Sequence, residues 1–184
     1  YMHQIRIHGR GGQGVVTAAE LIAAAAFKDG KFAQAFPSFG VERTGAPIEA
    51  FARIDKKQIR TREQVNNPDI LIIQDSTLID NERIKRGCGG KTVIIINTAK
   101  EKKDIKIKGV AAKNIYAVNA TKIALATLGK NIVNTTILGA FARATGLVSL
   151  NSLKEAIKEK FKDKGIETVN KNISAIEETY KQNF

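Results

Sequence analysis

The stretch Gln4-Ile5-Arg6-Ile7-His8-Gly9-Arg10-Gly11-Gly12-Gln13-Gly14-Val15 decides the fold of this chain. Residues 4–8 alternate and are rich in β-branched side chains, which predicts a strand. Residues 9–14 fit the pattern G-x-G-x-x-G, in which the glycines allow a tight turn. Residues 15–27 are rich in alanine and predict a helix that packs closely on a sheet. A strand, a glycine turn and a helix in this order typically open an α/β fold.

The rest of the chain alternates apolar strand-like segments with helical ones. The predicted strands are 32–36, 48–54, 70–74, 92–97 and 115–119. The predicted helices are 77–85, 120–128 and 137–145, followed after Ser149 by two amphipathic helices divided near Gly165. Continuous apolar strands between helices are typical of a parallel sheet covered on both faces. We therefore expect residues 1–184 to form one doubly wound, Rossmann-like α/β domain with a single, mostly parallel sheet. Its ligand crevice should lie at the carboxyl ends of the strands.

The glycine turn predicts a loop that binds an anion. Glycines let the backbone approach the anion closely, and the first N–H groups of the following helix add partial positive charge. A nicotinamide dinucleotide site would also need an acidic residue at the end of the second strand. Asp29 precedes that strand and Glu42 lies beyond it, so this specific requirement is not met. Two interpretations of the glycine turn remain: it binds a phosphate or pyrophosphate, or it is needed only for close packing of the strand and the helix.

The composition argues against several kinds of catalytic site. Cys88 is the only cysteine, and His3 and His8 are the only histidines. These are too few ligands for a zinc site or an iron–sulfur cluster, so no metal site is expected. The sequence also has no phosphate-loop motif and no G-x-S-x-G nucleophile motif. Because the chain has few side chains that could act as a nucleophile or a base, the sequence favours a binding subunit without catalytic residues of its own.

The chain is basic, with 30 lysine and arginine residues against 18 aspartate and glutamate residues. Nucleic-acid binding is disfavoured, because the lysines are scattered and no tryptophan is present to stack on bases. A basic chain also suits anionic ligands and acidic partner proteins. The sequence has no run of about 18 apolar residues, so no membrane span is predicted. With no secretory signal either, we expect a cytoplasmic protein.

The glycine motif is followed by a second block, Ala33-Gln34-Ala35-Phe36-Pro37-Ser38-Phe39-Gly40-Val41-Glu42-Arg43-Thr44-Gly45-Ala46-Pro47. Together the two blocks resemble the gamma subunits of pyruvate (2-oxoacid):ferredoxin oxidoreductases and the equivalent domain of the single-chain enzymes. Later pieces agree with this resemblance, among them Asn67-Pro68-Asp69, Asn134-Thr135 and Thr145-Gly146-Leu147-Val148. The resemblance covers most of the chain.

The resemblance implies a complex that oxidatively decarboxylates a 2-oxoacid, transfers the acyl group to coenzyme A (CoA) and passes electrons to ferredoxin. Thiamine diphosphate and iron–sulfur clusters would lie on thiamine-binding and ferredoxin-like partner subunits. This chain would contribute to CoA binding and would be inactive when isolated. The cofactor-binding residues expected from the matched motifs are Gly9, Arg10, Gly11, Gly12, Gln13, Gly14, Glu42 and Arg43, with Asn97 and Asn134 as weaker candidates.

The loop from Phe36 to Pro47 resembles the pyruvate type, which makes pyruvate the expected substrate. Glu42 and Arg43 in this loop would face the crevice or a partner subunit, or would form a salt bridge within the loop. Two alternatives remain for this chain. It could belong to a homologue specific for 2-oxoglutarate or branched-chain oxoacids, or it could be a free-standing nucleotide-binding oxidoreductase. Substrate choice is expected to depend largely on the thiamine-binding subunits.

Overall fold

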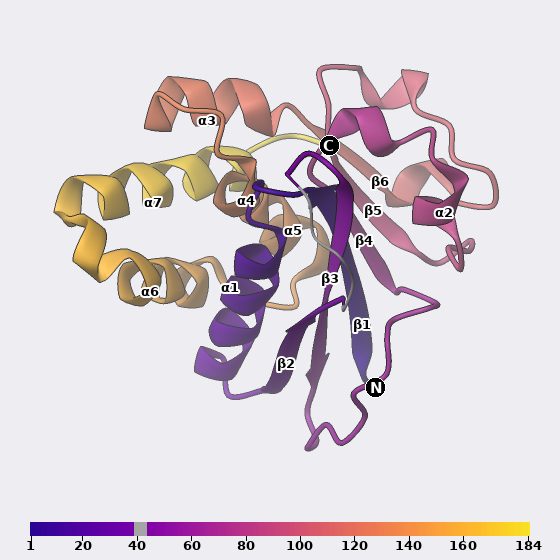
Figure 1. The fold of residues 1–184 in the computed structure, drawn as a ribbon, viewed down its shortest axis with the longest axis horizontal. Helices are drawn as coiled ribbons and strands as arrows, with labels where there is room; N and C mark the ends of the chain where they lie inside the picture. The colour runs from indigo at the N-terminus through magenta and orange to yellow at the C-terminus, as the bar shows by residue number, and fades with distance from the viewer. Residues whose placement is uncertain (39–43) are drawn as a thin grey trace.

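The computed structural model describes residues 1–38 and 44–184, which form a sheet with helices on both faces (Figure 1). The strands are β1 (His3–Arg10), β2 (Phe32–Pro37), β3 (Pro47–Asp55), β4 (Ile70–Ile73), β5 (Val93–Asn97) and β6 (Ile115–Val118). The helices are α1 (Val15–Lys28), α2 (Glu82–Lys85), α3 (Ala120–Leu128), α4 (Val133–Thr136), α5 (Leu138–Thr145), α6 (Leu150–Phe161) and α7 (Ile166–Tyr180).

The strands follow the order β2-β3-β1-β4-β5-β6 across the sheet. The strands β1, β4, β5 and β6 run parallel, and β3 runs antiparallel to both β1 and β2. The expected mostly parallel α/β sheet is confirmed. The exception, β3, has a simple cause. Only residues 38–46 separate it from β2, and a parallel connection needs a longer crossover.

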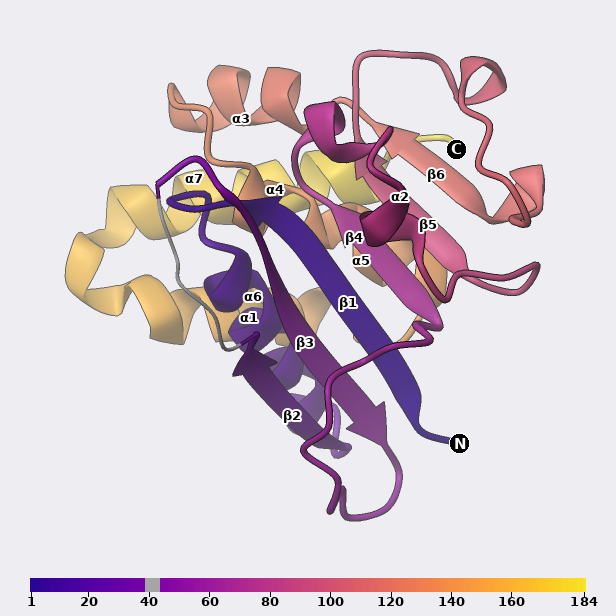
Figure 2. The same ribbon diagram turned by 45° about the vertical axis from the view of Figure 1, so that its right-hand side comes forward.

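Each face of the sheet has its own apolar core. On one face Ile5, Ile7 and Ile72 pack with residues of α1, α5, α6 and α7. On the other face Leu71 and Ile73 pack with the segments that follow β4 and β5. In Figure 2 the sheet lies between α2 in front and α1, α6 and α7 behind. Burial of both faces explains why β4 and β5 are continuous runs of apolar residues rather than alternating ones.

One expected helix differs in detail, and one expected helix break is found. The helix predicted over residues 77–85 is a 3-10 turn, Ser76–Leu78, followed by the short helix α2. The side chain of Asn81 accepts a hydrogen bond from the Arg83 N–H at 3.0 Å, so the chain starts a new helix there. The division near Gly165 is confirmed, because Gly165 adopts φ +89° between α6 and α7.

Two kinds of feature are missing from residues 1–38 and 44–184. No helix in this part of the chain is long and apolar enough to cross a membrane. The same residues include no group of three or more histidine, cysteine, aspartate or glutamate side chains that could hold a metal ion.

Candidate functional site

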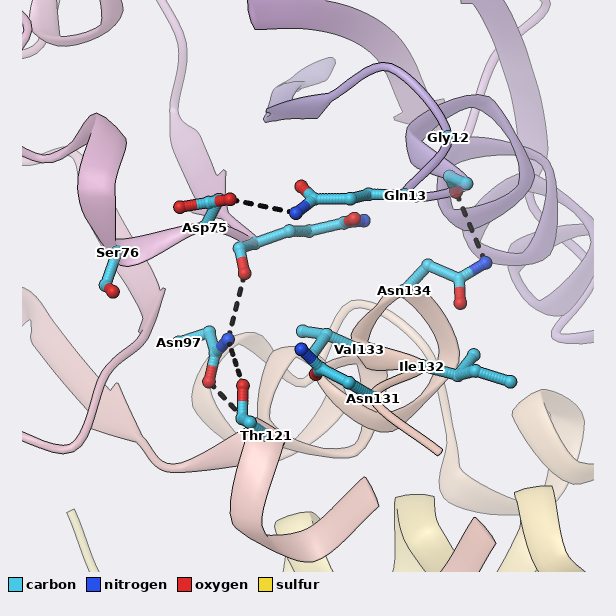
Figure 3. Close-up of a pocket in the computed structure, with 12 residues that line it drawn as sticks. Gly12, Gln13, Asp75, Ser76, Asn97, Thr121, Asn131, Ile132, Val133 and Asn134 are labelled. Carbon is cyan, nitrogen blue, oxygen red and sulfur yellow. Dashed lines mark hydrogen bonds between the residues drawn. The ribbon is translucent and has the colours of Figure 1, made fainter. Parts of the chain in front are cut away.

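A cavity of about 420 Å³ opens at the carboxyl ends of β4 and β5, beside the glycine turn and the start of α1 (Figure 3). This is where the sequence predicts a ligand crevice. Its walls come from four segments: the glycine turn, the residues after β4, the β5–α3 edge and the segment leading into α4. The lining residues are Gly12, Gln13, Gly14, Gln74, Asp75, Ser76, Asn97, Thr121, Asn131, Ile132, Val133 and Asn134.

The glycine turn has a conformation that only glycine adopts easily. Gly14 is the N-cap of α1 with φ 67°, and Gly12 has φ 90°. Gly9 is needed for a different reason, since a Cβ there would lie 2.6 Å from Val15 Cγ2. No side chain of the described residues caps the α1 N-terminus. The first N–H groups of α1 therefore have no side-chain acceptor, and the positive end of the helix dipole lies next to Gly14, which lines the cavity.

The two sequence blocks that carry the family resemblance lie together in space. Gly11 N–H donates to the Ala46 carbonyl oxygen at 2.8 Å, and Gly45 N–H donates to the Gly11 carbonyl oxygen at 3.1 Å. The second block is thereby held against the glycine turn. Glu42 and Arg43 fall within residues 39–43 and so lie outside the described residues. Their role stays a prediction.

Arg10 and Gln13 are bound to the segment after β4. Arg10 Nη2 donates to Thr77 Oγ1 at 2.8 Å, and Nη1 donates to the Gly45 carbonyl oxygen at 3.0 Å. Gln13 Nε2 donates to Asp75 Oδ2 at 2.8 Å, while its Oε1 accepts from the Arg10 N–H at 2.7 Å. Gln13 lines the cavity, whereas Arg10 lies outside the lining residues. Their contact with a ligand stays a prediction, and their visible role is to hold the turn to residues 75–77.

Asp75 gives the cavity its one carboxylate among the described lining residues. Burial alone would raise its pKa. Hydrogen bonds from Thr77 and Gln13, together with the charge of Arg10, outweigh burial and lower the pKa of Asp75 below its usual value. The carboxylate is therefore ionised at neutral pH, and it is already occupied by protein donors.

Asn97 and Asn134, the two weaker candidates, both line the cavity. Asn97 Nδ2 donates to the Gln74 carbonyl oxygen and to Thr121 Oγ1, each at 2.9 Å. Asn97 therefore ties the ends of β4 and β5 to the start of α3. Asn134 Nδ2 donates to the Gly14 carbonyl oxygen at 3.3 Å. It connects α4 to the glycine turn, as the dashed line in Figure 3 shows.

Sequence reasoning missed several lining residues, namely Gln74, Asp75, Ser76, Thr121, Asn131, Ile132 and Val133. One available pattern was the polar pair Gln74-Asp75 directly after the buried strand β4, at the edge where ligands bind in such sheets. The described lining residues include amides, hydroxyls and one carboxylate, but no lysine or arginine. The α1 N-terminus contributes partial positive charge beside the lining residue Gly14.

His8 lies at the end of β1 and is buried, which lowers the pKa of its imidazole to about 3. Burial is the main cause, and the nearby charge of Arg6 adds to it. Glu49 Oε2 lies 3.7 Å from His8 Nε2, too far for the hydrogen bond that would favour a charged imidazole. His8 is therefore a buried, neutral imidazole at neutral pH.

This buried histidine makes stability depend on pH. Between pH 6.5 and 3 the unfolded chain binds the proton that the folded chain excludes, so stability falls as the pH is lowered through that range. When the pH is lowered from 6.5 to 5, we expect the free energy of unfolding to fall by about 2 kcal/mol more for the wild-type chain than for the His8→Phe variant. Urea unfolding of both proteins at several pH values measures this difference. If the free energies of unfolding of the two proteins changed with pH in parallel, a neutral His8 would be contradicted.

Comparisons with known proteins agree with the fold and the motifs. The family model for pyruvate ferredoxin/flavodoxin oxidoreductase matches residues 4–182. The common gamma subunit of the pyruvate/ketoisovalerate oxidoreductases of Thermococcus kodakarensis is 50% identical over 181 residues, which cover 97% of this chain and 96% of that subunit. The match therefore extends over nearly the whole of both chains.

Two solved structures are similar in fold. The crystal structure of the pyruvate oxidoreductase subunit PORC from Thermotoga maritima has a TM-score of 0.82 and 35% identity, covering 98% of this chain and 96% of that one. The 2-oxoglutarate:ferredoxin oxidoreductase from Magnetococcus marinus has a TM-score of 0.77 and 22% identity. This chain spans 30% of that longer one, whose structure holds 2-oxoglutarate, coenzyme A and succinyl-CoA, and the likeness is one of fold. On the family match and the 50% identity, the chain belongs to the pyruvate ferredoxin/flavodoxin oxidoreductase family, among relatives named as gamma subunits.

Proposed function

We propose that this chain acts as a single gamma-type domain in a multi-subunit 2-oxoacid:ferredoxin oxidoreductase and that its cavity takes part of coenzyme A. The observation that carries the proposal is the cavity itself, which joins an uncapped α1 N-terminus to a wall of amides and hydroxyls. Coenzyme A has a diphosphate for the helix N-terminus and a polar nucleotide for the amides. The electron transfer and decarboxylation chemistry belongs to thiamine-binding and ferredoxin-like partners, with ferredoxin as acceptor.

Pyruvate is the favoured substrate of the complex, and the choice of oxoacid lies outside this chain. The Thermococcus kodakarensis relative is named as a gamma subunit common to pyruvate and ketoisovalerate oxidoreductases. One gamma chain there serves two substrates, which supports placing substrate choice on the other subunits. The Magnetococcus marinus enzyme, which shares the fold, is described with coenzyme A bound. That description supports coenzyme A as the shared co-substrate.

A nucleotide-binding oxidoreductase that works alone is the weaker alternative. It would require an acidic side chain to hold a ribose at the end of β2, and the residue that ends β2 is Pro37. Equilibrium dialysis of the chain and of the assembled complex against coenzyme A and NAD⁺ separates the two. Retention of coenzyme A by the complex, without NAD⁺, is the result we expect. Tight NAD⁺ binding by the chain alone would favour the alternative.

Replacing Asn134 by aspartate tests the cavity directly. The change places a negative charge beside the α1 N-terminus and removes the amide that holds Gly14. Because coenzyme A carries several phosphates, we expect its KM in the assembled complex to rise about tenfold, with the KM for pyruvate unchanged. Steady-state kinetics with each substrate varied in turn measures both constants.

Asn170→Asp is the matched control. Asn170 is exposed on α7 and lies outside the cavity. Its replacement by aspartate therefore changes the net charge by the same amount, but away from the cavity. Its KM for coenzyme A should equal that of the wild type. Equal coenzyme A constants for the Asn134→Asp variant and the wild type would refute the placement of coenzyme A in this cavity.

A further inference from the structure

Gln74 is a buried amide whose two polar side-chain atoms have no hydrogen-bond partner in the part of the chain that the structure describes. The residue is 2% exposed and lines the cavity at the glycine turn. Its backbone is held on both sides. The N–H donates to the His8 carbonyl oxygen at 2.8 Å, and the carbonyl oxygen accepts from Asn97 Nδ2 at 2.9 Å. The backbone is thus fixed at the sheet edge while the side-chain amide is left unsatisfied.

An unsatisfied buried amide destabilises a folded protein, so it calls for a reason. The neighbouring amides show the contrast. Gln13 uses its oxygen within the turn and its nitrogen on Asp75. Asn97 uses both its polar atoms between β4 and α3. Gln74 alone among these three side chains is unpaired at both atoms. We propose that Gln74 pairs with the adenine base of coenzyme A, an inference that rests on the proposed function of the cavity.

The geometry of the amide selects a base over the other parts of the ligand. A glutamine side chain holds a donor and an acceptor side by side, and the edge of adenine offers the matching N6 donor beside a ring-nitrogen acceptor. The two amides of the pantetheine arm are trans, with N–H and C=O on opposite sides, so either one satisfies only one atom of Gln74. A phosphate offers acceptors alone and leaves Oε1 unpaired.

The surroundings of Gln74 also suit a flat, uncharged ring. Ile132 is 39% exposed although it is large and apolar, and it lines the cavity next to Val133. These two side chains give the ring an apolar wall. The described lining residues carry no lysine or arginine to neutralise a phosphate deep in the cavity. The phosphates are better placed at the α1 N-terminus, next to Gly14.

The Gln74 amide lies beneath the glycine turn. A Cβ on Gly9 would lie 3.1 Å from Gln13 Oε1 and 3.4 Å from Gln74 Oε1, so both side chains meet at this glycine. Both polar atoms of Gln74 are closed off from solvent. Pairing with a base therefore requires Gln74 to rotate into the cavity or Gln13 to release Asp75. The Gln13 bonds are exposed, and water can replace them at small cost.

A comparison of two ligands in the assembled complex tests the pairing. In 1,N6-etheno-coenzyme A a ring that bridges N1 and N6 removes the N6 donor of adenine and blocks N1, while the ribose, the phosphates and the pantetheine arm are unchanged. We expect the wild-type complex to have a KM about tenfold lower for coenzyme A than for the etheno form, the value of one good hydrogen bond. The Gln74→Leu variant should have nearly equal constants for the two ligands. Gln58→Leu, an exposed control in the β3–β4 segment, should keep the wild-type ratio.

Thermal melting of the unliganded full chain supplies a readout independent of turnover. Because leucine has no polar group to leave unpaired, Gln74→Leu should melt about 3 °C above the wild type. A lower melting temperature would make Gln74 a structural residue and overturn the proposal. So would an unchanged ligand ratio in Gln74→Leu, even with weaker binding of both ligands. If Asn134→Asp weakens coenzyme A binding while that ratio is unchanged, only the base contact fails. If neither variant affects coenzyme A, the proposed function fails as well.

Discussion

Replacement of Arg6 by methionine is expected to lower the free energy of unfolding by about 4 kcal/mol. Arg6 is 4% exposed on β1, on the face away from α1. Its Nη1 donates to the carbonyl oxygens of Val65 and Asn66 at 3.0 and 3.1 Å. Its Nη2 donates to those of Ile84 and Arg86 at 2.8 and 2.6 Å. One guanidinium thus holds the β3–β4 segment and the end of α2 on the sheet.

The size of the effect comes from what the substitution leaves behind. Methionine fills a similar space but donates no hydrogen bond, so four carbonyl oxygens lose their donor together. Burial lowers the pKa of Arg6, yet an arginine keeps its charge in proteins, so the bonds lost are charge-assisted ones. Gly87 adopts φ +77° against the Asn66 carbonyl group, so this segment has little freedom to repack.

Urea unfolding of the wild type, Arg6→Met, Arg6→Lys and Arg60→Met measures the effect. Lysine keeps the charge but offers no planar fork for four carbonyls, so we expect a loss of about half that of methionine. Arg60 is exposed in the β3–β4 segment, and its replacement should change stability by less than about 0.5 kcal/mol. Equal losses for Arg6→Met and Arg60→Met would show that the carbonyl contacts do not stabilise the fold.

The sequence predicts the part of the fold that local patterns determine. The alternation of residues 4–8, the glycine turn and the alanine-rich α1 each depend on neighbours in the chain, and each is found as expected. The same applies to the buried runs that became β4 and β5. The burial of Arg6 could not be predicted from the local sequence pattern. The alternation of the strand alone would place Arg6 toward solvent. It is bound instead by the β3–β4 segment and the end of α2, both about 60 to 80 residues along the chain.

The candidate site is less predictable because strand order brings its parts together. β1 pairs in parallel with β4, with His8 opposite Ile73, which puts Gln74 beside Gly9. No pattern in the sequence states that β4, rather than β3 or β5, lies on that side of β1. The same pairing sends Arg10 and Gln13 toward Asp75 and Thr77. Those two side chains were expected to face a ligand, and the protein itself uses most of their hydrogen-bonding groups.

Replacement of Gly139 by alanine is expected to lower the free energy of unfolding by about 3 kcal/mol. Gly139 is buried in the first turn of α5, where α5 crosses α7. A Cβ there would overlap the Ile176 carbonyl oxygen and the Thr179 hydroxyl oxygen. That hydroxyl donates to the Thr136 carbonyl oxygen at 2.6 Å, so the clash also breaks a link between α7 and α4. Alanine is the better helix former by about 1 kcal/mol, and the expected loss is net of that gain.

The control and a second substitution separate the causes of this loss. Gly89 has room for a Cβ and lacks a positive φ, so Gly89→Ala should unfold like the wild type. In the Thr179→Ala background the hydroxyl oxygen is gone, but the Ile176 carbonyl oxygen remains in the way. Gly139→Ala should therefore cost less in that background, and still more than Gly89→Ala. If Gly139→Ala caused no loss of unfolding free energy in the Thr179→Ala background, the Thr179 hydroxyl would be the only group that clashes with the new Cβ. Equal unfolding free energies for Gly139→Ala and Gly89→Ala would mean that α5 and α7 can separate freely, and with them α4 and the Asn134 wall of the cavity.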